Sequence, residues 1–181
     1  MKLNDRVAII TGAGSGIGAA CARAFAQRGA KVVVVDRNAA GAQQVAQDIG
    51  GLAIACDIGS EEQVNAMVAR TQRELGPVDV FFSNAGIATG SDPLSTPLDV
   101  WAEQWQVNLM SHVYAVRAVL PSMLQRWIPG STARLVAMGT RRSSRYGAIS
   151  MTPGGSSRCS SSARVSWRTK LDGQPNASPA P

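Results

Sequence analysis

Cysteine is scarce in this sequence, and long apolar runs are missing. The three cysteines, Cys21, Cys56 and Cys159, are odd in number and widely spaced, with no Cys-x-x-Cys pair and no Cys/His cluster. This pattern argues against a disulfide framework and against a zinc site, so we expect no bound metal. No apolar run approaches the roughly 18 residues of a membrane span. The run at 7–10 is too short for a signal peptide. These absences predict a cytoplasmic protein that does not contact a membrane.

Acidic residues are almost absent from the C-terminal part. Residues 1–138 hold 11 basic and 11 acidic side chains and are neutral. Residues 139–181 hold seven basic side chains and one acid, Asp172, and this excess of basic groups accounts for the net charge of +6. Residues 139–181 also contain ten Ser and four Pro but only three of Val, Ile, Leu or Phe. So little apolar surface does not offset the entropy lost on ordering. We therefore expect one domain at 1–138 and a disordered Ser/Arg-rich tail at 139–181.

The arginines of this tail raise the alternative of a nucleic-acid or anionic-surface binder. Aromatic side chains hardly interleave with them beyond Trp167, and the neutral residues 1–138 suggest no basic face. Nucleic-acid binding is therefore the weaker interpretation.

Residues 1–138 alternate short β-branched runs with longer helical patterns, which is typical of β–α–β units on a parallel sheet. The continuous run KVVVV at 31–35 fits a strand that is covered on both faces. We expect strands at 6–11, 31–35, 52–56, 78–82 and 134–138, and helices at 17–28, 39–49, 61–75 and 98–127. Pro121 should kink or restart the last helix. The predicted fold class is α/β, a Rossmann-type doubly wound parallel sheet of about five strands.

A glycine-rich loop, TGAGSGIG at 11–18, joins the first strand to the first helix. Such a loop lets the backbone approach a pyrophosphate, which the helix N-terminus then stabilises. Asp36 ends the second strand, near the position where a carboxylate accepts both ribose hydroxyls of an adenosine. The alternative is a tight turn, with Asp36 capping the next helix. A P-loop NTPase is excluded, because the loop has no Gly-Lys-Ser/Thr ending.

The carboxylate of Asp36 also bears on the choice of cofactor. It would repel the 2′-phosphate of NADP at a few ångströms, although Arg37 would weaken that repulsion. We therefore expect NAD in preference to NADP.

Four motifs in this order and spacing resemble the short-chain dehydrogenase/reductase family. They are the loop at 11–18, Cys56-Asp57-Ile58, Asn84-Ala85-Gly86 and Asn108. The resemblance covers residues 1 to about 140, a little over half of a typical member. It implies an NAD(P)-dependent oxidoreductase that interconverts an alcohol and a carbonyl by hydride transfer, with a small-molecule substrate.

The resemblance implies roles for the matching residues. The cofactor-binding residues would be Gly12, Ser15, Gly16, Ile17 and Gly18 around the pyrophosphate, Asp36 at the ribose, Asp57 and Ile58 at the adenine, and Asn84, Ala85 and Gly86 at the nicotinamide ribose. Asn108 would hold a water in a proton relay. Plainer alternatives remain: Asp57 capping a turn, Asn84 satisfying buried backbone groups, and Asn108 pointing to solvent.

The catalytic pair that the resemblance implies is missing. Family chemistry uses a Ser–Tyr–Lys device, in which the lysine lowers the tyrosine pKa from its ordinary value of about 10. No Tyr-x-x-x-Lys occurs in this chain, since Ala118 and Ser150 lie four residues after Tyr114 and Tyr146. In one register Pro153 and Ser157 replace the pair, and in a looser one Ile149 and Pro153 do.

Substitutes for the missing groups are few. Thr140 could supply the hydroxyl, and Tyr146 could act with Arg142 or Arg145, although an arginine does not exchange protons as a lysine does. We therefore expect little or no turnover, with a catalytically inactive module that binds NAD as the alternative.

The missing C-terminal half of the family pattern has further consequences. The fifth strand would become an exposed edge, so we expect a marginal, aggregation-prone fold in a truncated chain. The abrupt change after residue 138 suggests translation out of frame, a hypothesis that the coding DNA across codons 138–155 tests. The substrate stays open, and a homo-oligomer is possible. We interpret His112 as a surface or interface residue, and the Trp101/Trp105 pair as a packing stripe.

Overall fold

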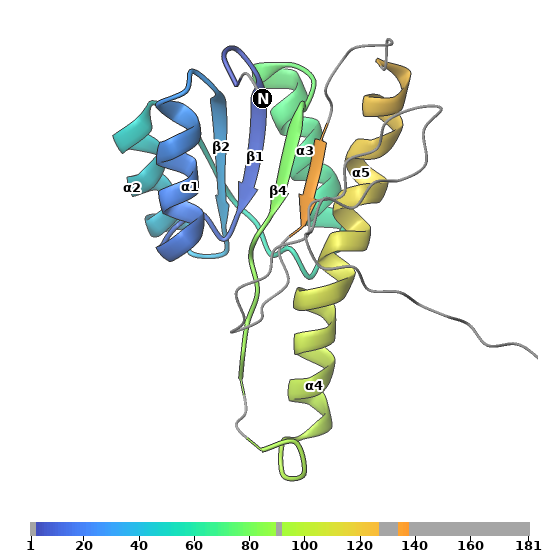
Figure 1. Cartoon of the computed structure of the whole chain (residues 1–181). Helices are drawn as coiled ribbons and strands as arrows, with labels where there is room; N and C mark the ends of the chain where they lie inside the picture. Colours follow the sequence, from blue (N-terminus) through green and yellow to red (C-terminus); the bar gives the residue numbers. More distant parts are fainter. Residues whose placement is uncertain (1–2, 90–91, 127–133, 138–181) are drawn as a thin grey trace, which may run out of the picture.

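The computed structural model describes residues 3–89, 92–126 and 134–137, the last four by backbone alone. Within these residues, five parallel strands form one sheet in the order β3-β2-β1-β4-β5 (Figure 1). The strands are β1 (Val7–Thr11), β2 (Lys31–Asp36), β3 (Leu52–Ala55), β4 (Val80–Ser83) and β5 (Arg134–Ala137). The Rossmann-type parallel α/β fold expected from the sequence is confirmed.

Helices cover both faces of this sheet. The α-helices of the described residues are α1 (Gly16–Ala26), α2 (Ala39–Ile49), α3 (Glu61–Leu75), α4 (Leu98–Trp105) and α5 (Ser111–Gln125). Helices α1 and α2 pack on one face, and α3 and α5 pack on the other (Figure 1). The architecture is therefore three layers, with two apolar cores.

Successive strand residues alternate between the two cores. The first residue of each neighbouring pair packs with α3 and α5, and the second packs with α1 and α2. The pairs are Ile9/Ile10, Val33/Val34 and Phe81/Phe82. Because both faces are covered, successive residues in the middle of these strands are apolar, and each fully buried large side chain contributes about 1.5–3 kcal/mol. This explains the uninterrupted apolar runs of the sequence.

The strand order reverses direction between β1 and β4. The chain runs outward from β1 through β2 to β3, and then returns to place β4 and β5 on the other side of β1. In open parallel sheets, ligands bind in the crevice at the carboxyl ends of the strands that flank such a switch point. The loops after β1 and β4 meet there.

The helix expected over 98–127 is three consecutive segments. Helix α4 is followed by a π-helical turn, η1 (Gln106–Met110), and then by α5. Helix α5 continues through Pro121 to Gln125, so the helix does not restart at the proline. The hydrogen-bonding pattern changes at 106–110 instead, and π turns inside α-helices are frequent at functional sites.

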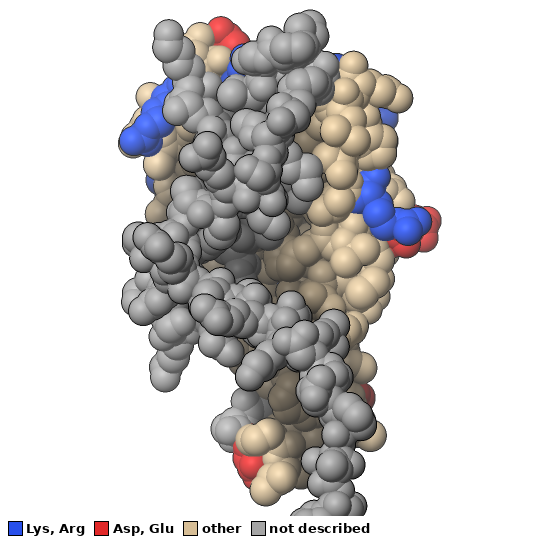
Figure 2. All heavy atoms as spheres, turned by 45° about the vertical axis from the view of Figure 1, so that its right-hand side comes forward, with Lys and Arg blue, Asp and Glu red and all other residues tan. Residues whose placement is uncertain are grey.

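Helix α4 extends beyond the carboxyl edge of the sheet and buries none of its residues (Figure 1). Trp101 and Trp105 are 46% and 62% exposed. Among the described residues that are visible in Figure 2, the charged side chains lie toward the margins of the view. The packing stripe expected from this tryptophan pair is therefore largely uncovered within the described part of the chain.

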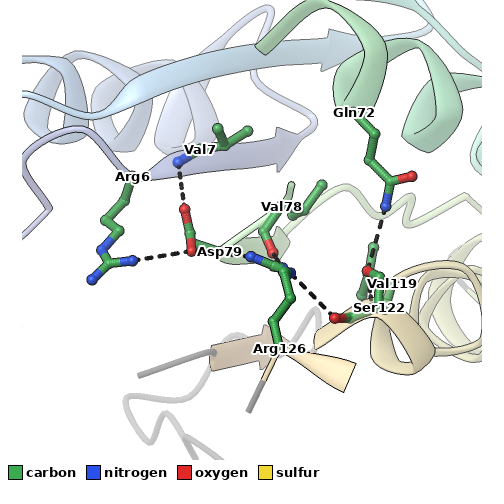
Figure 3. A network of polar contacts seen from close by, with 8 residues as sticks. All are labelled: Arg6, Val7, Gln72, Val78, Asp79, Val119, Ser122 and Arg126. Atoms are coloured by element: carbon green, nitrogen blue, oxygen red, sulfur yellow. Dashed lines mark hydrogen bonds and ion pairs between the residues drawn. The ribbon is translucent and has the colours of Figure 1, made fainter. Parts of the chain in front are cut away.

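A polar network attaches the C-terminal end of α5 to the side of the sheet where β1 and β4 begin (Figure 3). Asp79 accepts a hydrogen bond from the Val7 backbone N–H at 3.0 Å and pairs with Arg6 at 3.3 Å. Arg126, just after α5, lies 3.6 Å from Asp79 and donates to the Val78 carbonyl oxygen. These contacts hold α5 against the start of β4, so the N-terminal end of α5 lies beside the carboxyl edge of the sheet.

Among the described residues, no helix combines the length and the apolar character that a membrane span requires.

Candidate functional site

A cavity of about 280 Å³ lies at the carboxyl ends of the strands, beside the switch point. It is lined by Gly12, Ser15, Asp36, Arg37, Cys56, Asp57, Ile58, Asn84, Ala85, Gly86, Ile87 and Val107. Eight of the eleven cofactor-binding residues expected from the sequence are in this wall. Gly16, Ile17 and Gly18 form the adjoining first turn of α1. The fold thus gathers residues from four separate loops around one hollow.

The glycine loop packs too closely for side chains. A Cβ on Gly12 would lie 2.8 Å from the Cα of Ala85, and a Cβ on Gly18 would lie 2.1 Å from the Gly12 carbonyl oxygen. Nothing lies within 4 Å of the corresponding point at Gly16. The loop is therefore pressed against the neighbouring loop after β4, while the start of α1 stays open on its outer side.

The N-terminus of α1 lacks the side-chain cap that the two following helices have. The Ser15 side chain makes no capping hydrogen bond, and the first turn carries no acid. In contrast, Asn38 caps α2 and Ser60 caps α3. The free N–H groups and the positive end of the helix dipole suit an anion such as a pyrophosphate. Ile17, 60% exposed, stands at the same turn.

The carboxylate of Asp36 is fixed in the cavity wall by two backbone N–H groups. Its Oδ2 accepts from Gly14 and its Oδ1 accepts from Asn38, both at 2.9 Å. A Cβ on Gly14 would lie 2.9 Å from the Asp36 carboxyl carbon, which explains the absence of a side chain at residue 14. Because Asn38 caps α2, Asp36 does not play the capping role of the alternative interpretation.

The turn at Asp57-Ile58 is held by its own hydrogen bonds and also lines the cavity. Asp57 Oδ1 accepts from the Gly59 N–H at 2.9 Å, and the Asp57 N–H donates to Gln63 Oε1 at 2.9 Å. The carboxylate therefore closes its own turn, as the plainer alternative held, while it also lines the cavity. Ile58 is buried beside it.

Cys56 lines the cavity as an un-ionised thiol. Burial, with a smaller effect from the Asp57 charge, raises the pKa of Cys56 to about 11. A thiolate is the nucleophilic form of cysteine. Cys56 is therefore not suited to act as a nucleophile near neutral pH.

Asn84 joins the two strands that flank the switch point. Its Nδ2 donates to the Thr11 carbonyl oxygen at 3.0 Å, and its backbone N–H donates to Thr11 Oγ1 at 3.0 Å. The Ala85 N–H donates to the same hydroxyl oxygen at 3.1 Å. The side chain of Asn84 thus satisfies a backbone carbonyl, as its plainer alternative held, and it fixes the loop 84–86 against β1.

Asn108 lies in η1 and points toward the loop after β4. Its Oδ1 accepts from the Ile87 N–H at 2.8 Å, and its Nδ2 donates to the Ile87 carbonyl oxygen at 2.7 Å. This pair of bonds excludes the alternative in which the side chain points to solvent. The relay water that the resemblance implies stays a prediction.

The described part of the chain is similar to proteins of one family. A model of the short chain dehydrogenase family matches residues 6–156. The chain belongs to this family. The match continues past residue 140, where the resemblance seen in the motifs ends. Short-chain dehydrogenases are oxidoreductases that bind a nicotinamide dinucleotide.

Several relatives of this short-chain dehydrogenase chain are known. A 7alpha-hydroxysteroid dehydrogenase of Escherichia coli is 39% identical over 128 residues, which are 68% of this chain and 50% of that protein. A D-threitol dehydrogenase of Mycolicibacterium smegmatis is 35% identical over 129 residues, 68% of this chain and 50% of that protein. The chain thus spans about half the length of the curated relatives it matches.

Solved short-chain dehydrogenase structures share the fold. The 3-ketoacyl-(acyl-carrier-protein) reductase of Brucella melitensis, complexed with NADH, superposes with a TM-score of 0.72 at 36% identity, covering 75% of this chain and 57% of that one. A hydroxysteroid dehydrogenase of Escherichia coli has a TM-score of 0.68 at 33% identity, covering 75% and 56%.

The structure describes only one of the three catalytic candidates that the sequence analysis named. Thr140 and Tyr146, together with Ile149, Pro153 and Ser157, lie outside the described residues. Asn108 is the one catalytic candidate that the structure places.

Sequence reasoning overlooked several residues near the site. Ile87, in the loop after β4, and Val107, in η1, line the cavity, and Gln106, also in η1, contacts the turn at 57–59. Nothing in the sequence indicated a π turn at 106–110. His112 Nδ1 lies 2.6 Å from Ser83 Oγ, and burial lowers the pKa of His112. His112 is half-buried, and no sequence spacing indicated its contact with Ser83, 29 residues away.

Proposed function

We propose that this chain binds NAD at the 280 Å³ cavity and does so in preference to NADP. The carrying observation is the combination of the uncapped N-terminus of α1 with the fixed carboxylate of Asp36 in one cavity wall. The first suits a pyrophosphate, and the second suits a ribose diol, which donates two hydroxyl hydrogens. The close-packed glycines leave the space that a dinucleotide backbone needs.

The preference for NAD follows from charge. The Gly14 and Asn38 N–H groups hold Asp36 in place, so a 2′-phosphate could not displace the carboxylate without breaking both hydrogen bonds. Two negative groups at about 4 Å repel by about 1–4 kcal/mol, depending on the effective dielectric constant. The exposed cation of Arg37 reduces this repulsion without removing it.

The bound nicotinamide would supply hydride transfer between an alcohol and a carbonyl. The chain's own part would be to orient the ring through the loop 84–87, which Thr11 holds at Asn84 and Asn108 holds at Ile87, and to donate or accept a proton at the substrate oxygen. The family pattern assigns that proton to a tyrosine tuned by a lysine. In this chain the corresponding positions hold Ile149 and Pro153, or Pro153 and Ser157. We therefore infer that the chain binds its cofactor but turns over little or no substrate.

The alternative is residual turnover in which Tyr146 supplies the proton and Thr140 the hydroxyl. It is tested by following NADH absorbance with a panel of small ketones and aldehydes, alongside calorimetric titration with NADH. Binding without oxidation of NADH supports the inactive dinucleotide-binding chain. Turnover that disappears in Tyr146→Phe would support the alternative instead.

Self-association is proposed as a second property. Exposed apolar side chains on α4, η1 and α5 would be covered in a homo-oligomer. They include Leu98, Trp101, Trp105, Leu109 and Val113. Sedimentation velocity over a range of concentrations tests this, and a monomer at all concentrations contradicts it.

The cytoplasmic location, the absence of nucleic-acid binding and the out-of-frame origin of 139–181 stay predictions.

A further inference from the structure

Gln106 links the turn at 57–59, part of which lines the cavity, to Tyr114 in the core of the protein. Its Nε2 donates to the Gly59 carbonyl oxygen at 3.1 Å and to the Tyr114 hydroxyl oxygen at 2.7 Å. The side-chain amide has two N–H donors, so both are used. We infer that Gln106 is a positioning residue, which sets the adenine end of the site through the turn at 57–59. This inference rests on the nucleotide binding proposed above.

The turn that Gln106 contacts carries the residues proposed for the adenine ring. On one side Gln63, in α3, accepts a hydrogen bond from the Asp57 N–H. On the other side Gln106 holds the Gly59 carbonyl. A turn held at both ends loses less conformational freedom when a ligand binds, so its affinity is higher than that of a loose turn.

Gln106 and Asn108 lie two residues apart in η1 and contact two different loops. Gln106 donates to the Gly59 carbonyl oxygen, while Asn108 binds the backbone of Ile87. One turn of helix thus holds the loop proposed for the adenine and the loop proposed for the nicotinamide at the same time.

A second hollow, of about 450 Å³, lies where Gln106 meets this turn. It shares Arg37, Asp57 and Val107 with the first cavity, and Gln106 is in its wall. Tyr114 is in neither wall and packs against the core that α3 and α5 form. Its hydroxyl can therefore influence a nucleotide only indirectly, and Gln106 is the contact that would transmit the effect.

The test uses AMP as the probe and the full chain as the protein. Four proteins are titrated by calorimetry: the wild type, Gln106→Leu, Tyr114→Phe and the double variant. Losing a hydrogen bond that orders the turn should weaken AMP binding about three- to tenfold in Gln106→Leu. Tyr114→Phe should weaken it by a smaller factor, and it should have no further effect once Gln106 is replaced.

The control is Gln104→Ala, two residues earlier, at the end of α4. Gln104 Nε2 donates to the Thr89 carbonyl oxygen at 2.8 Å, on the loop after β4, so AMP affinity should be unchanged. Urea unfolding of each variant checks the fold, and Gln106→Met replaces the leucine variant if the latter does not fold.

Two results would overturn the inference while the proposed function stands. In one, the wild type binds AMP and NADH but Gln106→Leu binds AMP equally well. In the other, the Tyr114→Phe effect is as large in the double variant as in the wild type, which would indicate a general effect on the fold. Absence of AMP and NADH binding by the wild type would instead contradict the proposed function, and the inference with it.

Discussion

Asp36 Oδ2 accepts a hydrogen bond from the Gly14 backbone N–H at 2.9 Å, which links the end of β2 to the glycine loop after β1. The two residues are 22 positions apart in the sequence, yet each constrains the other. Asp36 fixes the loop, and the lack of a side chain at Gly14 makes room for the carboxylate. The loop geometry therefore depends on this contact, and under the proposed function the choice of cofactor would depend on it as well.

Removing the charge of Asp36 should change cofactor preference. In Asp36→Asn the side chain keeps a hydrogen-bond acceptor, but it no longer repels a 2′-phosphate. We expect NADPH to bind about tenfold more tightly relative to NADH than in the wild type, measured by fluorescence titration. Asp99→Asn removes an exposed carboxylate on α4 whose Oδ1 accepts from Val100, and its preference should equal that of the wild type. An unchanged ratio in Asp36→Asn would contradict the role given to this residue.

Adding a methyl group at Gly14 should displace the carboxylate. The new Cβ would lie 2.9 Å from the Asp36 carboxyl, so Gly14→Ala should weaken NADH binding about tenfold through overpacking. Gly50→Ala is the matched control. It strains a left-handed helix end (φ 64°) with open space around it, and should lower stability by about 1 kcal/mol without changing NADH affinity. Equal NADH affinity in Gly14→Ala and wild type would contradict this account.

The hydroxyl of Thr11 should be important for stability. It is buried and accepts from the Asn84 and Ala85 N–H groups. Thr11→Val keeps the shape but leaves two donors unpaired, so the free energy of unfolding should fall by about 2–4 kcal/mol in urea denaturation.

Thr71→Val provides the comparison for this substitution. Thr71 is equally buried, but its hydroxyl donates to the Met67 carbonyl within α3, one turn earlier. The Met67 carbonyl oxygen lies inside a regular helix and keeps its backbone hydrogen bond when the hydroxyl is removed. We therefore expect the free energy of unfolding to fall by about 1 kcal/mol or less. Equal losses in the two variants would show that the link between β1 and β4 has no special role.

Stability should decline in mildly acidic solution because of His112. Burial holds its pKa below the ordinary value of 6.5, so the unfolded chain binds the proton more readily than the folded one. The stabilisation is complete above pH 6.5 and is lost as the pH falls toward the folded pKa. Urea unfolding at pH 7.5 and 5.5 should show a smaller difference for His112→Gln than for the wild type. An equal difference would mean that other groups cause the decline.

The strands and helices around the cavity could be predicted because local signals and tertiary packing agree there. The alternation of apolar runs with amphipathic stretches located each of the five described strands, and the glycine loop and Asp36 were among the residues that the structure gathers at one cavity. Strand ends differed by one or two residues, since β4 begins at Val80 and not at Val78.

The rest depended on contacts that no sequence spacing reveals. The π turn at 106–110 has no sequence signal, whereas Pro121, which predicted a kink or a restart of the helix, lies inside α5, which continues to Gln125. The partners of Asn108, Gln106 and His112 are 21, 47 and 29 residues away, so only the fold brings them together.

Calorimetric titration of the full chain with NADH and with NADPH decides whether the cavity is an NAD site whose preference depends on charge. We predict one binding site per chain and tighter binding of NADH. Equal affinities would contradict the role of Asp36, and no heat of binding with either dinucleotide would contradict the assignment of the site.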